Sequence, residues 1–254
     1  MMARFLSALM LCWLVLCWLA ATGAARAADY ANWAVAIVAG DNHAHDGSHS
    51  AVFDNARKKL ATAFAGIGFS PANMIQFSVE PDAGAQPASI SAFASGLWDL
   101  SSRAPDGCLV YFTSHGTTEG LVMGDAILPP SRMGAIIHNA CGDKPAVIVV
   151  SACFSGQFVP ALAAANRVVI TAARADRASF GCGALNTLTY FDDCFLRALP
   201  MADGFARLGE LAQECVAFRE QQTGASPPSE PQVQVGAKAG GLTFAATAPA
   251  PRSR

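Results

Sequence analysis

Two residues that could carry nucleophilic chemistry follow two successive apolar segments. His115 comes directly after "LVYFTS" and precedes Gly116, while Cys153 comes directly after "VIVVSA". A thiol is mostly protonated at neutral pH, and a nearby imidazole can take its proton and later protonate a leaving amine. Taken alone, a cysteine at the end of an apolar run could also be a disulfide half or a metal ligand. We therefore treat His115 and Cys153 as a candidate dyad, with the backbone N–H groups of Gly116 and Cys153 as candidate oxyanion donors.

The segments around this pair predict the elements that must position it. Apolar runs of strand length are expected as strands at 33–40, 74–79, 108–113, 145–150 and 167–172. Apolar residues at helical spacing predict one helix after the first strand, one beginning after Ser89, and two more at about 187–199 and 203–222. Between the third and fourth strands, a hairpin and a short helix are expected. This alternation predicts an α/β sandwich with a mainly parallel central sheet. Functional groups gather at the carboxyl ends of such strands, so His115 and Cys153 should share one rim.

The N-terminal segment has the pattern of a secretory leader. Arg4 precedes the apolar run "FLSALMLCWLVLCWLA", and "ARA" at 25–27 has the small-x-small spacing of a cleavage site. We expect a signal peptide at 1–27, although an uncleaved anchor is an alternative. One domain is then expected over 28–239, with a flexible C-terminal tail over 240–254. The leader predicts an exported, periplasmic or secreted protein.

Charge and cysteine spacing disfavour several classes of function. The formal charge of −2 becomes −4 when Arg4 and Arg26 leave with the leader, and no basic stripe remains to bind nucleic acid. The absence of CxxC pairs disfavours a zinc ribbon or a thioredoxin-type site. Cys194 and Cys215, on two successive predicted helices, are the expected disulfide. Cys108, at the start of a strand, is expected to be plain core.

The candidate dyad lies in segments that resemble a known family. "LVYFTSHGTTEGLV" and "VVSACFSG" resemble the His-Gly and Ala-Cys-x-Ser-Gly motifs of the legumain (asparaginyl endopeptidase) family of cysteine peptidases, and similarity extends over about 33–200. The resemblance implies a caspase-like three-layer fold with helices on both faces of the sheet. It also implies peptide-bond cleavage without metal or cofactor, with His115 as general base and acid, Cys153 as nucleophile and Gly116 as an oxyanion donor.

The same resemblance implies a substrate pocket. Ser48 and Phe154 occupy the positions where legumains have a pocket arginine and glutamate, and His49 matches the loop histidine. Asp193 matches the pocket aspartate, although Asp192, the residue before it, would match if the alignment shifted by one position. A lone pocket carboxylate favours a cationic partner, so we expect cleavage after Arg or Lys rather than after Asn.

The sequence leaves more than one function open. The leading hypothesis is an exported cysteine endopeptidase that acts on peptides or proteins through an acyl-enzyme, with no nucleic-acid partner and no membrane contact after leader cleavage. There are two alternatives. One is a transpeptidase or transamidase that uses the same dyad, and the other is a non-catalytic caspase-like binding module. The loop "HAHDGSH" at 43–49 could bind a metal, because imidazoles and carboxylates suit zinc, or could form a pocket wall or a solvated loop. His138 is expected to be structural.

Overall fold

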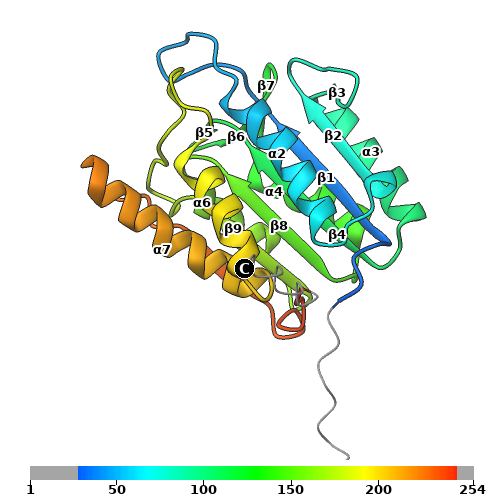
Figure 1. The fold of residues 1–254 in the computed structure, drawn as a ribbon. Helices are drawn as coiled ribbons and strands as arrows, with labels where there is room; N and C mark the ends of the chain where they lie inside the picture. The colour runs from blue at the N-terminus through cyan, green and yellow to red at the C-terminus, as the bar shows by residue number, and fades with distance from the viewer. Residues whose placement is uncertain (1–27, 245–254) are drawn as a thin grey trace, which may run out of the picture.

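A seven-stranded sheet forms the centre of the computed structural model, which describes residues 28–244. The strand order is β10-β9-β8-β4-β1-β2-β3, and every neighbouring pair is parallel except β10 with β9 (Figure 1). The strands are β1 (Trp33–Ala39), β2 (Met74–Ser78), β3 (Gln86–Pro87), β4 (Gly107–Thr113), β8 (Ala146–Ser151), β9 (Arg167–Thr171) and β10 (Gln232–Val235).

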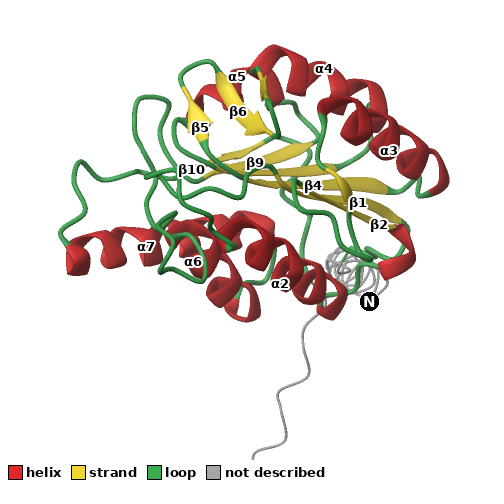
Figure 2. Cartoon of the chain, turned by 90° about the horizontal axis from the view of Figure 1, so that it is seen from above, coloured by secondary structure: helices red, strands yellow, loops and turns green. Residues whose placement is uncertain are grey.

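Helices cover both faces of this sheet, as Figure 2 shows. On one face lie α2 (Val52–Gly66), α6 (Tyr190–Ala198) and α7 (Phe205–Thr223), and on the other α3 (Ile90–Arg103), α4 (Pro130–Cys141) and α5 (Val159–Leu162). A small antiparallel sheet consists of β5 (Gly116–Thr117), β6 (Gly120–Met123) and β7 (Ala126–Leu128), and the 3-10 turns are η1 (Pro71–Asn73), η2 (Ser155–Phe158) and η3 (Leu199–Met201). The predicted three-layer α/β sandwich is confirmed.

The inner strands read as unbroken apolar runs because both of their faces are buried. In β1, Val35 and Ile37 pack into the core under α2 and α6, while Ala36 and Val38 pack into the core under α3 and α4. Burial on both faces removes the polar alternation of a half-exposed strand. The strand ends are therefore where polar residues first appear.

The register between β4 and β8 places the candidate dyad. The two strands run parallel, and Thr113 at the end of β4 is paired with Ser151 at the end of β8. His115 and Cys153 each follow two residues later. The two residues therefore leave the sheet from neighbouring strands at the same level, as predicted.

The cysteines differ from expectation at one position. Cys194 and Cys215 form the expected disulfide, but Cys108 is also bonded, to Cys141 at the end of α4. Helical packing brings Cys141 against the first residues of β4, a contact between positions 33 residues apart that spacing alone does not reveal. Cys153 and Cys182 are free.

The packed C-terminal segment continues past residue 239. Residues 240–244, predicted as the start of a flexible tail, pack on the domain: Leu242 is only 9% exposed, and the Phe244 ring lies 4.8 Å from that of Phe205. Two apolar side chains within a run of small residues are enough to hold this segment. The predicted signal peptide at 1–27, and 245–254, lie outside the described residues.

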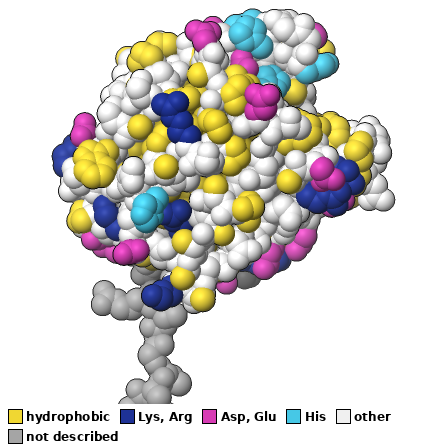
Figure 3. Space-filling model, turned by 180° about the vertical axis from the view of Figure 1, so that it is seen from behind, with side chains coloured by type: hydrophobic (Ala, Val, Ile, Leu, Met, Phe, Trp, Pro, Cys, Tyr) yellow, Lys and Arg dark blue, Asp and Glu magenta, His cyan; other side chains and the backbone are white. Residues whose placement is uncertain are grey.

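The described surface carries no continuous charge of one sign on the face seen from behind. Figure 3 shows Lys, Arg, Asp and Glu side chains scattered singly or in small mixed groups there. Within residues 28–244, the helices are too short or too polar to cross a bilayer.

Candidate active site

One open cavity of about 790 Å³ brings the candidate dyad together. His115, Gly116 and Cys153 all line it, at the carboxyl ends of β4 and β8. The loop 44–47 after β1 and the loop 178–186 after β9 form its other walls. Residues from four segments far apart in the sequence thus surround one thiol and one imidazole.

Cys153 is held at the exit of β8 by a strained turn. Phe154 adopts a left-handed conformation with φ of 56°, unusual for a residue with a bulky side chain, and its N–H donates to the Arg177 carbonyl at 2.7 Å. The N–H of Ser179 donates to the Cys153 sulfur at 3.3 Å. A donor aimed at the sulfur stabilises negative charge that develops on it. Backbone strain at such a position is typical of functional turns.

The His115 ring is oriented by the loop after β1. Its Nε2 lies 2.9 Å from the His43 carbonyl oxygen, and its ring meets the edge of the Phe53 ring with centroids 5.2 Å apart. A carbonyl can only accept, so this bond requires the proton on Nε2 and leaves the lone pair of the neutral ring on Nδ1. Within the described chain, His115 and Cys153 share the cavity without a direct hydrogen bond between them.

Gly116 lies directly against the backbone of Cys153. A Cβ at position 116 would meet the Cys153 carbonyl oxygen at 2.0 Å and its carbonyl carbon at 2.9 Å. These are backbone atoms of the strand exit, which cannot move aside cheaply. Only glycine lets the two backbones approach this closely.

Gly116→Ala is therefore expected to reduce kcat at least about 100-fold, the cost of losing one oxyanion donor or of displacing the nucleophile by about 1 Å. The matched control is Gly66→Ala at the end of α2, where an added Cβ would meet no atom within 4 Å of the described structure. Steady-state kinetics on a fluorogenic peptide measure both variants. Full activity in Gly116→Ala would contradict the close approach.

Three further residues support this arrangement. The Ser155 hydroxyl accepts the Ala173 N–H at 3.0 Å and so ties the turn after β8 to the loop after β9. The Gln157 amide donates to the Thr117 carbonyl at 2.7 Å, which ties η2 to β5. With Ser179, they link the cysteine turn to both neighbouring walls. The serine after Cys153 in the Ala-Cys-x-Ser-Gly motif was the one available signal, and its hydroxyl is structural.

The residues predicted for the substrate pocket lie outside the cavity around Cys153. Ser48, His49, Phe154 and Asp193 do not line the cavity around Cys153. The Ser48 hydroxyl bonds to Asp46, and the exposed His49 ring pairs with Glu80 at 3.0 Å. The loop 44–47 turns back on itself between Ala44 and Ser48, so the histidine it offers to the cavity is His45.

Asp193 lies behind the cavity wall. Its carboxylate accepts from Arg197 at 3.0 Å and from Arg219 at 2.6 Å. The Arg219 guanidinium in turn stacks 4.2 Å from the ring centre of Tyr190, which lines the cavity. A carboxylate engaged by two guanidinium groups is not a free partner for a substrate cation, so the expected preference for Arg or Lys loses its basis.

The histidines of the 43–49 loop have separate partners. His43 pairs with Asp41 at 2.7 Å and His49 with Glu80, while His45 faces the cavity. Within residues 28–244, the His, Cys, Asp and Glu side chains form no group of three or more that could hold a metal ion. The loop therefore acts as a cavity wall.

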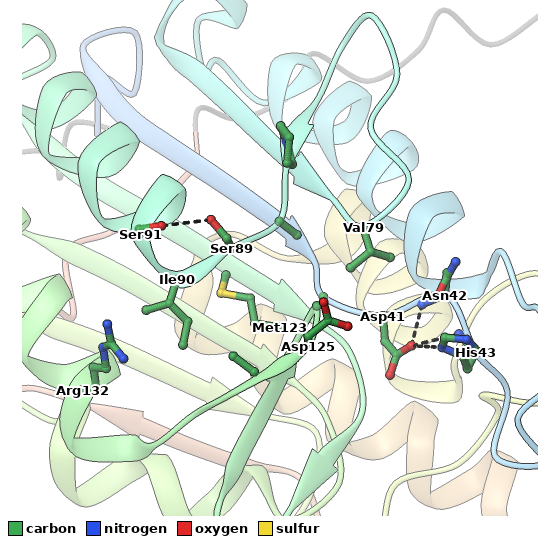
Figure 4. Close-up of a pocket in the computed structure, with 15 residues that line it drawn as sticks. Asp41, Asn42, His43, Val79, Ser89, Ile90, Ser91, Met123, Asp125 and Arg132 are labelled. Carbon is green, nitrogen blue, oxygen red and sulfur yellow. Dashed lines mark hydrogen bonds and ion pairs between the residues drawn. The ribbon is translucent and has the colours of Figure 1, made fainter.

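A second cavity of about 720 Å³ lies beyond the backbone of the 40–43 segment (Figure 4). Asp41 holds His43 on its rim, and Ser89 and Ser91 at the start of α3 contact each other at 3.3 Å. His43 connects the two cavities, because its side chain lines the second while its carbonyl orients His115 in the first.

Comparison with known proteins agrees with this geometry. The Peptidase C13 family matches residues 90–204, a span that includes both His115 and Cys153. Among solved structures, caspase-1 from Spodoptera frugiperda superposes with a TM-score of 0.59 at 14% identity, over 83% of this chain and 88% of the caspase, a likeness of fold alone. No curated protein sequence matches the chain significantly. The family match over residues 90–204 indicates cysteine peptidase activity, and together the two matches confirm the predicted caspase-like fold, which resembles that of the legumain (Peptidase C13) family.

Proposed function

We propose that the protein is an exported cysteine endopeptidase that cleaves peptide bonds through His115 and Cys153. The observation that carries this proposal is the shared cavity, where a free thiol, an imidazole with a fixed tautomer and the close backbone of Gly116 meet. Each is a component that acyl transfer to a thiol requires.

The reaction follows from the tautomer. The Nδ1 lone pair of His115 takes the Cys153 proton, and the sulfur attacks the carbonyl carbon of the scissile bond. The N–H groups of Gly116 and Cys153 stabilise the resulting oxyanion. His115 then donates its proton to the leaving amine, which leaves an acyl-enzyme. Water, deprotonated by the same ring, releases the acid and restores the thiol.

Export is supported by the cysteines as well as by the leader pattern. The disulfide Cys108–Cys141 joins β4 to α4 on one face of the sheet, and Cys194–Cys215 joins α6 to α7 on the other. Disulfides of this kind persist in oxidising compartments and are rare in the cytosol. The protein would then meet its substrates outside the cytoplasm.

The cavity favours an uncharged side chain before the scissile bond. Its lining in the described chain includes His45, Phe180, Asn186 and Tyr190 but no Asp, Glu, Lys or Arg. A charged side chain placed there would lose water without gaining an ion pair, whereas a neutral polar one could bond to the Asn186 amide. We infer that specificity comes from a polar, uncharged wall.

A fluorogenic panel varied only at the residue before the scissile bond tests this function. We expect turnover, with uncharged residues cleaved at least about ten-fold better in kcat/KM than Lys, Arg, Asp or Glu, because ionic groups are costly to desolvate unpaired. Asn186→Asp should shift the preference toward Lys and Arg, while Asp193→Asn, behind the wall, should not. No turnover of any peptide would refute the peptidase assignment. Amide products formed from an added amine would instead identify a transpeptidase.

A further inference from the structure

Asp192 is a fully buried carboxyl group beneath the candidate site. Its side chain is 0% exposed, in the first turn of α6, where its N–H donates to the Thr189 hydroxyl at 3.0 Å. Burial raises the pKa of Asp192, an effect that hydroxyl donors around it oppose. No Lys or Arg pairs with it within residues 28–244. Burying a carboxyl group without a cationic partner destabilises a fold unless hydrogen bonds offset the cost, and such groups gather at functional sites.

Asp192 lies where the two strands that carry the dyad end side by side. On β4, the Thr113 hydroxyl donates to one carboxylate oxygen at 2.6 Å, and the Tyr111 hydroxyl donates to the other at 2.8 Å. On β8, the Ser151 hydroxyl lies close enough to the same carboxylate to lower its pKa. Thr113 and Ser151 are register partners at the two strand ends. The carboxylate is therefore bonded to β4 at the last rung of the β4–β8 ladder and lies beside β8 there.

The position of this link matters because both reactive residues follow it closely. His115 lies two residues beyond Thr113, and Cys153 lies two residues beyond Ser151. The remaining support of the strand exits includes the Ser114 N–H to the Ser151 carbonyl at 3.1 Å, which is a single main-chain bond. A carboxylate bonded to Thr113 from beneath, beside Ser151, adds a second constraint on the two exits.

We propose that Asp192 is a positioning residue, which holds the exits of β4 and β8 at the spacing that His115 and Cys153 need for proton transfer. This role rests on the proposed function. It assigns Asp192 no contact with substrate, because the side chain lies under the strands and outside the cavity. Misplacing a nucleophile by about 1 Å can cost on the order of 100-fold in rate.

The test compares Asp192→Asn with Thr113→Val, which removes one of its donors without changing shape much. Both should lower kcat about 100-fold with KM nearly unchanged, and should shift the pH profile of Cys153 alkylation by iodoacetamide. Thr113→Ser, which retains the hydroxyl, should restore activity. The matched control is Glu220→Gln on α7, another buried carboxylate, which is held by Ser229 and lies away from both strand ends. It should lower the melting temperature without changing kcat or the alkylation profile.

The outcomes separate this role from the function on which it rests. A wild-type protein that cleaves no peptide and alkylates Cys153 no faster than a free thiol would refute the proposed function, and the positioning role with it. An active wild type whose kcat and alkylation profile survive both Asp192→Asn and Thr113→Val would overturn the positioning role alone. If Asp192→Asn does not fold, Thr113→Val and its serine rescue decide the question. If Glu220→Gln lowered kcat as much as Asp192→Asn does, the loss would reflect reduced stability and would contradict a positioning role for Asp192.

Discussion

Replacing Cys153 by alanine is expected to abolish peptide cleavage, with a loss of at least about 10⁴-fold in kcat, because the acyl-enzyme can no longer form. The fold should persist, because the side chain is only half-buried and its sulfur accepts a single main-chain N–H. Turnover by a discontinuous peptide assay and the melting temperature are measured on the same preparation. Wild-type turnover in the alanine variant would remove the peptidase assignment.

Alkylation gives a second measurement of the same thiol. Cys182 lines the same cavity and is also free, but burial raises the pKa of its thiol. The thiolate is the reactive form, so iodoacetamide near neutral pH should label Cys153 before Cys182. Peptide mass mapping of partly labelled protein distinguishes the two. Faster labelling of Cys182 would contradict an activated Cys153.

Replacing His115 by alanine should lower kcat by about 10³-fold or more, since the base for the thiol and the acid for the leaving amine are lost together. It should also abolish the fast alkylation of Cys153. An asparagine side chain has no basic nitrogen, so His115→Asn should be as inactive as the alanine variant.

His138→Ala is the matched control for the imidazole. His138 is exposed in the last turn of α4, outside the cavity around Cys153. Its replacement should change the melting temperature slightly and leave kcat unaltered. Inactivation by His138→Ala together with activity in His115→Ala would show that the strand-end arrangement does not carry the chemistry.

The sheet and the shared rim were predictable because both depend on local patterns. Strands such as Trp33–Ala39 are apolar throughout, and each apolar run ends where polar residues begin, so the exits of β4 and β8 could be located to within a residue. The Ser89 cap of α3 was equally readable, and its hydroxyl accepts the Ala92 N–H at 3.2 Å. A parallel sheet then places all such exits at one edge.

The pocket walls and one disulfide were not predictable because they depend on how loops return to the sheet. The turn between Ala44 and Ser48 decides that His45 and not His49 faces the thiol, and no local pattern reports that turn. Asp192 and Asp193 are neighbours on one helix, so a rotation of about 100° per residue sends one carboxylate under the sheet and the other to Arg219. Sequence position alone cannot choose between them.

The two edge strands of the sheet, β3 and β10, bear on how the protein avoids aggregation. At one end the outermost strand is only Gln86–Pro87, and proline offers no N–H to an approaching chain. At the other end β10 has four residues, after which Gly236 and Lys238 bond back to the backbone at Arg167 and Ala165. Short edges expose few unpaired main-chain groups, so a second chain finds little to extend. The continuous apolar strands that build the site are thus kept in the middle of the sheet, away from any edge that could start a fibril.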